Sequence, residues 1–227
     1  MKIVNLVILV LVLLIQSQFC EAQDWPGLGR YRDSNEVLKA APVPANRVVF
    51  MGNSITDFWI KASPEFFERH HYIDRGISGQ TSPQMLVRFR ADVISLKPKA
   101  VVLLCGTNDI AGNTGPSTLE MIEDNIMSMA ELAKVNGIKV VLCSVLPAYA
   151  FPWKPEVHPA EKIIALNQWI KKYAGDNKMI YLDYYSSLVD DKGGMKPDYS
   201  KDGVHPNKTG YQVMENLAEA VLSKVVH

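Results

Sequence analysis

Runs of consecutive apolar residues recur along the chain from residue 47 onward, and segments with apolar residues at helical spacing separate them. These runs lack the apolar/polar alternation of a half-exposed strand, which predicts strands that are buried on both faces, as in a parallel sheet. Five such strands are expected, at 48–51, 71–74, 100–105, 138–145 and 179–183.

Helix signals fill the gaps between the expected strands. Helices are predicted from Ser82-Pro83, from a capping box at Ser117 and Glu120, from 159 to 175, and from 207 to 226. Short alternating strand and helix units predict a flavodoxin-like, three-layer α/β/α fold with a five-stranded parallel sheet in the order 2-1-3-4-5. In that order the crevice between the first and third strands is the expected ligand site.

The composition fits one well-buried domain, because the chain has 227 residues of which 48% are hydrophobic. The 24 basic residues equal the 24 acidic ones, which argues against a nucleic acid or an acidic membrane surface as partner. A small-molecule or carbohydrate substrate fits better. No glycine-rich phosphate loop and no metal-ligand spacing is present in the sequence, so no cofactor and no metal is expected.

The first 22 residues have the pattern of a signal peptide. Lys2 precedes an apolar stretch that is too short for a membrane span, and Cys20 and Ala22 supply the small residues that precede a cleavage site. Lipidation at Cys20 is disfavoured because Phe19 is bulky. We therefore expect a signal peptide (1–22), an N-terminal segment (23–46) and one domain (47–227), in a periplasmic or secreted protein whose mature form has no stable membrane anchor.

Two cysteines remain after such a cleavage, Cys105 and Cys143, and both follow apolar runs of expected central strands. Export would allow a disulfide, but neighbouring parallel strands seldom give its geometry. Buried free thiols are therefore expected in preference to a bridge.

Three polar residues have the chemistry of acyl transfer. Such a site needs a hydroxyl nucleophile, an imidazole base and a carboxylate that orients the imidazole. Asp202 and His205 lie three residues apart, so one tight turn can present both side chains. Ser54 follows the first expected strand, at the edge of the sheet where open α/β folds place their ligands. The sequence thus predicts a triad of Ser54, His205 and Asp202.

Four short blocks appear in a characteristic order, and together they resemble the SGNH (also called GDSL) hydrolase family. The blocks are Gly52-Asn53-Ser54, Gly76-Ile-Ser-Gly79, Gly106-Thr-Asn108-Asp109 and Asp202-Gly-Val-His205. The resemblance covers the chain from about residue 47 to its end. It implies a serine esterase whose nucleophile is Ser54.

The resemblance also implies an oxyanion hole with donors from three blocks. These are the backbone N–H groups of Ser54 and Gly79 and the side-chain amide of Asn108. One residue departs from the family pattern, because Asn53 stands where the motif has aspartate. That position is not a member of the triad, so the change bears on local hydrogen bonding in the loop and leaves the mechanism intact. Asp109 is interpreted as structural.

Aromatic residues near the expected crevice are candidates for substrate contact. Trp59 follows Ser54 by five residues, and Tyr149 and Trp153 lie in a proline-rich segment after the fourth expected strand. Such rings suit stacking on a sugar, contact with an acyl chain, or simple packing of the loop.

These features favour a secreted serine esterase that removes short acyl groups, above all acetyl, from carbohydrate hydroxyls. Two alternatives stay open. One is a lysophospholipase or thioesterase of the same family, and the other is a non-catalytic carbohydrate-binding protein on the same scaffold.

Overall fold

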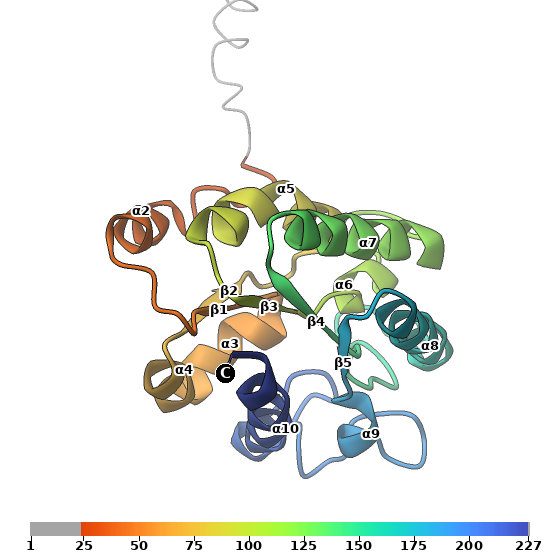
Figure 1. Cartoon of the computed structure of the whole chain (residues 1–227). Helices are drawn as coiled ribbons and strands as arrows, with labels where there is room; N and C mark the ends of the chain where they lie inside the picture. Colours follow the sequence, from red (N-terminus) through yellow and green to blue (C-terminus); the bar gives the residue numbers. More distant parts are fainter. Residues whose placement is uncertain (1–23, 227) are drawn as a thin grey trace, which may run out of the picture.

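A computed structural model describes residues 24–226 of the chain. Five parallel strands form one sheet in the order β2-β1-β3-β4-β5, and helices cover both of its faces (Figure 1). The predicted fold, a three-layer α/β/α arrangement with this strand order, is confirmed. The predicted signal peptide lies outside the described residues.

The five strands are short and mostly buried. They are β1 (Val48–Gly52), β2 (Tyr72–Gly76), β3 (Ala100–Leu103), β4 (Lys139–Cys143) and β5 (Ile180–Leu182). In β1, Val48 is in register with Tyr72 of β2 on one side and with Ala100 of β3 on the other. Each strand overlaps the range predicted for it, although β2 contains Asp74 and Arg75 and is not an apolar run. Strands β3 and β4 end earlier than expected, because residues 104–105 and 144–145 already belong to the loops at the carboxyl edge of the sheet.

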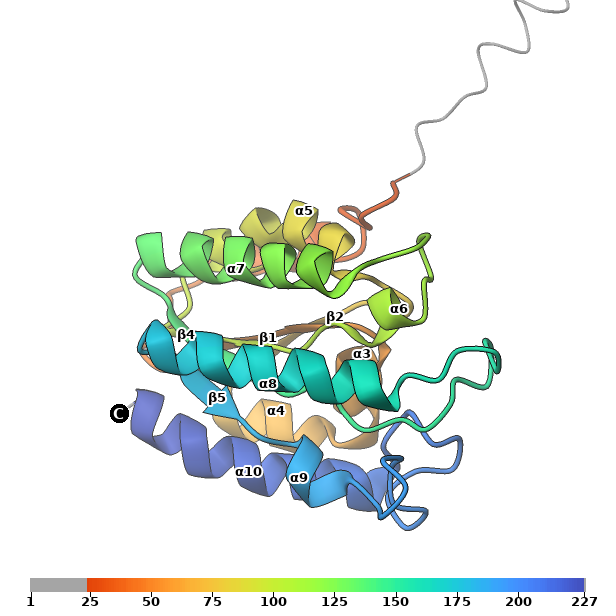
Figure 2. The ribbon, with the colours of Figure 1, turned by 90° about the vertical axis from the view of Figure 1, so that its right-hand side faces the viewer.

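Successive residues of each strand face two separate apolar cores, as the strand geometry requires. Val49 and Met51 of β1 pack into one core, and Val48 and Phe50 pack into the other. The first core lies under α2 (Arg32–Ala40), α5 (Ser82–Asp92), α6 (Thr107–Ile110), α7 (Leu119–Val135) and α8 (Ala160–Asp176). The second lies under α3 (Ser54–Ala62), α4 (Pro64–His70), α9 (Tyr185–Leu188) and α10 (Lys208–Val226) (Figure 2).

Helices α2, α3 and α4 and the short helices α6 and α9 have no counterpart among the predicted elements. Helix α2 is short, its buried residue is the polar Asn35, and its Leu38 is partly buried against the first core. Helix α7 begins close to the predicted capping box, but Thr118 is its N-cap, and the Thr118 hydroxyl accepts a 3.3 Å hydrogen bond from the N–H of Met121. The predicted cap at Ser117 is therefore wrong by one residue.

The two cysteines are buried free thiols, as predicted. Cys105 packs into the core under α5 and α7, whereas Cys143 packs into the core on the opposite face of the sheet. Burial raises the pKa of both thiols, so neither is poised to ionise near neutral pH.

Candidate active site

Ser54 is the first residue of α3, directly after β1. The side-chain oxygen of Asn53 accepts a 3.0 Å hydrogen bond from the N–H of Ile55, so Asn53 caps the helix. Asparagine is a strong N-cap residue because its oxygen satisfies one of the free N–H groups of the first turn. Asn53 stands where the motif has aspartate, and its side-chain oxygen still caps the helix that begins with Ser54.

The structure brings Ser54 together with His205 and Asp202. Oγ of Ser54 lies 2.9 Å from Nε2 of His205, and Nδ1 of His205 lies 2.7 Å from Oδ2 of Asp202. These contacts join the end of β1 to the loop before α10. In this arrangement the imidazole can accept a proton from the hydroxyl while the carboxylate holds the ring in the tautomer that accepts it.

The turn itself fixes the carboxylate of Asp202. Its Oδ1 accepts hydrogen bonds from the backbone N–H groups of Val204 (2.9 Å) and His205 (2.8 Å). Partial burial alone would raise the pKa of Asp202, but these bonds and the one to the His205 ring lower its pKa to about 2. Asp202 therefore stays ionised at neutral pH.

Ser200 closes this turn and is a site residue that the sequence analysis missed. Its hydroxyl lies 2.8 Å from the carbonyl oxygen of His205 and 3.1 Å from Oδ1 of Asp202, and it accepts a hydrogen bond from the N–H of Gly203 (3.0 Å). The only signal in the sequence is a serine two residues before an aspartate, which is too common to be informative.

The other candidate donors lie at the carboxyl ends of the neighbouring strands. Gly79 follows β2, and Asn108 follows β3. Gly79 has φ +79°, a conformation that side chains with a Cβ seldom adopt. Asn108 is buried, and its Nδ2 donates a 2.8 Å hydrogen bond to the carbonyl of Gln80. Since that nitrogen has two hydrogens, the second can serve a ligand oxygen.

Gly76 allows α3 to pass close to the end of β2. A Cβ at this position would lie 2.1 Å from the backbone nitrogen of Asp57 in the first turn of α3. Asp57 in turn accepts a 2.6 Å hydrogen bond from the hydroxyl of Ser78, two residues beyond Gly76. The loop that contains Gly79 is thereby packed and hydrogen-bonded against the helix that begins with Ser54.

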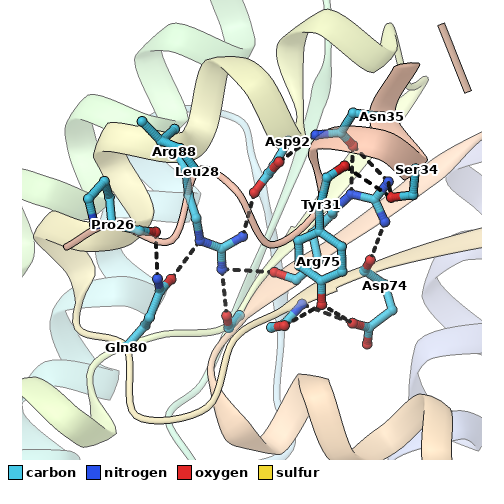
Figure 3. Close-up of polar contacts among 12 residues, drawn as sticks. Pro26, Leu28, Tyr31, Ser34, Asn35, Asp74, Arg75, Gln80, Arg88 and Asp92 are labelled. Atoms are coloured by element: carbon cyan, nitrogen blue, oxygen red, sulfur yellow. Dashed lines mark hydrogen bonds and ion pairs between the residues drawn. The ribbon is translucent and has the colours of Figure 1, made fainter. Parts of the chain in front are cut away.

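A buried arginine holds this edge of the sheet together (Figure 3). The guanidinium of Arg88, on α5, donates to the carbonyl oxygens of Gly52 (3.0 Å) and Arg75 (2.9 Å), at the ends of β1 and β2. It also donates to Oε1 of Gln80 (2.6 Å) and to the carboxylate of Asp92 (2.8 Å). One fully buried cation thus fixes two strand ends and the loop between Gly79 and α5.

The N-terminal segment packs against the same network (Figure 3). Nε2 of Gln80 donates a 2.6 Å hydrogen bond to the carbonyl of Pro26, and Asn35 of α2 bonds both Asp92 (2.6 Å) and the guanidinium of Arg75 (2.8 Å). The N-terminal segment therefore contacts the loop between Gly79 and α5 through Gln80, and the end of β2 through Arg75.

Asp109 joins the third block to the start of α5. Its carboxylate accepts hydrogen bonds from the backbone N–H (2.9 Å) and the hydroxyl (2.6 Å) of Ser82, the first residue of α5. Burial raises the pKa of Asp109, and the bonds from Ser82 oppose that rise. This contact agrees with the structural interpretation of Asp109.

The prediction that Trp59 contacts the substrate is wrong. Its side chain is only 1% exposed, packs with Phe66 and Tyr211, and donates from Nε1 to Glu215. Helical geometry explains the error. A residue five positions after Ser54 is rotated by about 140° from it around the helix, whereas Phe58, four positions after it, is rotated by only about 40°.

Phe58 and Trp153 flank His205. Their rings lie 5.3 Å and 6.2 Å, respectively, from the imidazole, measured between centroids. Both remain partly exposed, at 38% and 41%, so a ligand can reach them. Trp153 therefore lies where the sequence places it, and Phe58 is the aromatic residue that the sequence analysis missed. Tyr149 is 61% exposed on the same loop.

The model of the GDSL-like lipase/acylhydrolase family matches residues 50–213. Among solved structures, a protein of Bacteroides fragilis NCTC 9343, provisionally described as an acylhydrolase, is 50% identical, with a TM-score of 0.88 over 90% of this chain and 100% of its own. A GDSL-like lipase of Bacteroides thetaiotaomicron VPI-5482 is 48% identical, with a TM-score of 0.84 over 88% of this chain and 98% of its own.

A curated relative gives a more distant match. An acetylxylan esterase of Xylanibacter ruminicola is 27% identical over 84% of this chain, and this chain spans 46% of the length of that esterase. The family match covers well over half of the chain and includes the end of β1, all of β2 and β3, and the loops that follow these strands. The chain therefore belongs to the GDSL-like lipase/acylhydrolase family.

Proposed function

We propose that the protein is a serine carboxylic ester hydrolase in which Ser54 is the nucleophile, His205 the general base and acid, and Asp202 the residue that orients His205. The continuous contact from Ser54 Oγ through the imidazole to the Asp202 carboxylate, at 2.9 and 2.7 Å, is the observation that carries the proposal. Family membership supports the same reaction class.

In the first half of the reaction, Ser54 Oγ attacks the carbonyl carbon of the ester while Nε2 of His205 takes the hydroxyl proton. The carbonyl oxygen becomes an oxyanion that accepts hydrogen bonds from the N–H groups of Ser54 and Gly79 and from Nδ2 of Asn108. When the intermediate collapses, the C–O bond to the alcohol breaks, and the leaving oxygen takes the proton from His205. An acyl-Ser54 ester remains.

In the second half, water attacks the acyl carbon and gives its proton to His205. The second oxyanion occupies the same donors, and its collapse releases the carboxylic acid and returns the proton to Ser54 Oγ. Asp202 stabilises the imidazolium that forms in both halves and does not itself take up a proton. No step needs a cofactor.

We further propose that the natural substrates are short-chain esters, in particular acetyl groups on carbohydrate hydroxyls. The partly exposed rings of Phe58 and Trp153 lie beside His205, and aromatic faces suit contact with a sugar ring. The similarity to an acetylxylan esterase supports this choice.

The substrate proposal is tested with p-nitrophenyl esters of two, four and eight carbons, followed by acetylated xylo-oligosaccharides. We expect kcat/KM to fall as the acyl chain lengthens and acetate to be released from the oligosaccharides. A rise towards the octanoate would identify a lysophospholipase or thioesterase instead. Binding of acetylated sugars without any hydrolysis would identify a carbohydrate-binding protein.

We also propose that the protein is exported after cleavage of residues 1–22. Between residues 24 and 226 no helix has both the length and the apolar character needed to cross a membrane. Sequencing the N-terminus of the protein purified from its host tests the cleavage. A mature chain that begins at residue 23 is expected, and a lipidated N-terminus at Cys20 would replace the proposal with a lipoprotein.

A further inference from the structure

Asn113 contacts two of the three residues that supply candidate oxyanion donors, Gly79 and Asn108. Its Nδ2 donates a 3.0 Å hydrogen bond to Oδ1 of Asn108 and lies 3.4 Å from the carbonyl oxygen of Gly79. Its backbone N–H donates to the carbonyl of Asn108 as well, at 3.0 Å. Asn113 lies in the loop after α6, and the proposed mechanism gives it no role.

The bond to Asn108 Oδ1 fixes which end of that amide faces the oxyanion. An amide rotated by 180° would present its oxygen in place of its N–H donor, and it would repel the oxyanion. Asn113 Nδ2 on one side and the Gln80 carbonyl, 2.8 Å from Asn108 Nδ2, on the other admit only the donating orientation.

Asn113 is also bound to the loop that contains Trp153. Nε1 of Trp153 donates a 3.1 Å hydrogen bond to Oδ1 of Asn113. The next residue, Lys154, donates from Nζ to the carbonyl of Gly112 at 3.3 Å. The indole beside His205 is thus joined to the Asn108 amide through one asparagine side chain, which uses its donor on one partner and its acceptor on the other.

We propose that Asn113 is a positioning residue: it holds the amide of Asn108 in the donating orientation, and Trp153 in turn holds Asn113. The inference rests on the proposed function, because it assigns a role to the surroundings of that oxyanion hole. It also gives Trp153 a second task besides contact with the substrate. Loss of this indole N–H should slow even a substrate too small to reach the ring.

A double-mutant cycle on p-nitrophenyl acetate tests the proposal. Asn113→Ala is expected to lower kcat about tenfold with little change in KM, as for the loss of one hydrogen bond that acts in the transition state. In the Asn108→Ala background the same substitution should have no further effect, because the amide that it orients is gone. Asn216→Ala, at an exposed position on α10, is the matched control and should leave kcat unchanged.

Two conservative variants separate positioning from simple packing. Asn113→Asp keeps an acceptor for Trp153 but cannot donate to Asn108, so it should lose as much kcat as Asn113→Ala. Trp153→Phe keeps a ring but has no N–H, so it should lower kcat several-fold on p-nitrophenyl acetate and cause no further loss in Asn113→Ala.

The outcomes distinguish this inference from the proposed function. If the wild type is active and Ser54→Ala is inactive, but the losses from Asn113→Ala and Asn108→Ala multiply, the positioning role is overturned and the esterase stands. An unchanged kcat in Asn113→Ala has the same meaning. A wild type without esterase activity, or an active Ser54→Ala, overturns both.

Discussion

The guanidinium of Arg88 donates a 2.6 Å hydrogen bond to the side-chain oxygen of Gln80, and the side-chain nitrogen of Gln80 binds the carbonyl of Pro26 (Figure 3). One glutamine thus connects a fully buried cation to the N-terminal segment. The backbone carbonyl of the same glutamine accepts from Asn108. The geometry of the oxyanion loop therefore depends on residues that lie well behind it.

Arg88→Met tests this dependence. The substitution removes the Arg88 hydrogen bonds to Oδ2 of Asp92 and to two strand-end carbonyls, which are all buried, so the free energy of unfolding should fall by roughly 3–5 kcal/mol. Urea denaturation gives this value. Arg90→Met, on the exposed side of the same helix, is the control and should change stability little. A fall below about 1 kcal/mol would show that water replaces the lost contacts.

Asp74 should make stability depend on pH. Burial raises its pKa to about 7, and its Oδ2 is buried without a partner in the described structure. The ordinary pKa, which applies to the unfolded chain, is 3.8. Between pH 3.8 and about pH 7, Asp74 is therefore protonated in the folded protein and ionised in the unfolded chain. Asp74 therefore contributes stability at low pH that is lost as the pH rises to about 7.

Asp74→Asn removes this charge and keeps an oxygen for the Gly76 N–H and the Tyr31 hydroxyl. The difference in unfolding free energy between the variant and the wild type should increase by roughly 2 kcal/mol in favour of the variant when the pH is raised from 5 to 8. Urea denaturation at both pH values measures this difference. The exposed Asp191→Asn serves as the control. Parallel pH profiles for wild type and Asp74→Asn would refute the raised pKa.

Phe58 and Trp59 should respond in opposite ways to replacement by alanine. Trp59→Ala removes a buried ring, and it should cost about 3–5 kcal/mol of stability while the folded fraction stays active. Phe58→Ala should leave stability nearly unchanged and raise KM for ester substrates, because its ring lies 5.3 Å from that of His205. Urea denaturation and steady-state kinetics on both variants decide this. A loss of stability without a kinetic effect in Phe58→Ala would place Phe58 in the core.

Asp202→Asn tests the orientation of the imidazole. The neutral amide can no longer stabilise the imidazolium or select the tautomer, so kcat should fall by about 10³- to 10⁴-fold with the fold intact. Circular dichroism checks the fold, and p-nitrophenyl acetate hydrolysis gives the rate. Wild-type kcat in this variant would mean that His205 needs no carboxylate.

The fold could be predicted from the sequence, because most of the buried strands are continuous apolar runs; β2, which contains Asp74 and Arg75, is the exception. Helix α2 was missed because it is short and its buried residue, Asn35, is polar and bonds Asp92. The four blocks identified the residues of the site, since the first three follow β1, β2 and β3 and the fourth lies in the loop before α10.

Other parts of the site depend on contacts that no local pattern encodes. Asn113 forms hydrogen bonds with Asn108 and Trp153, Ser200 forms them within the turn of Asp202 and His205, and neither residue lies in a recognisable motif. Trp59 and Phe58 differ only in their rotation around α3, which could not be assigned because α3 was not predicted. The hydrogen bonds of Asn113 and Ser200 and the orientation of the two rings on α3 are therefore seen only in the folded structure.

The central claim is that Ser54 carries the acyl group between the two halves of the reaction. Rapid acid quenching during turnover of p-nitrophenyl acetate, followed by peptide mapping, tests it most directly. We predict one acetyl group on Ser54 in the wild type, with a burst of p-nitrophenol of matching size, and neither label nor turnover in Ser54→Ala. Turnover that continues with Ser54 unmodified, or an acetyl group on another residue that forms as fast as the burst, would contradict the account.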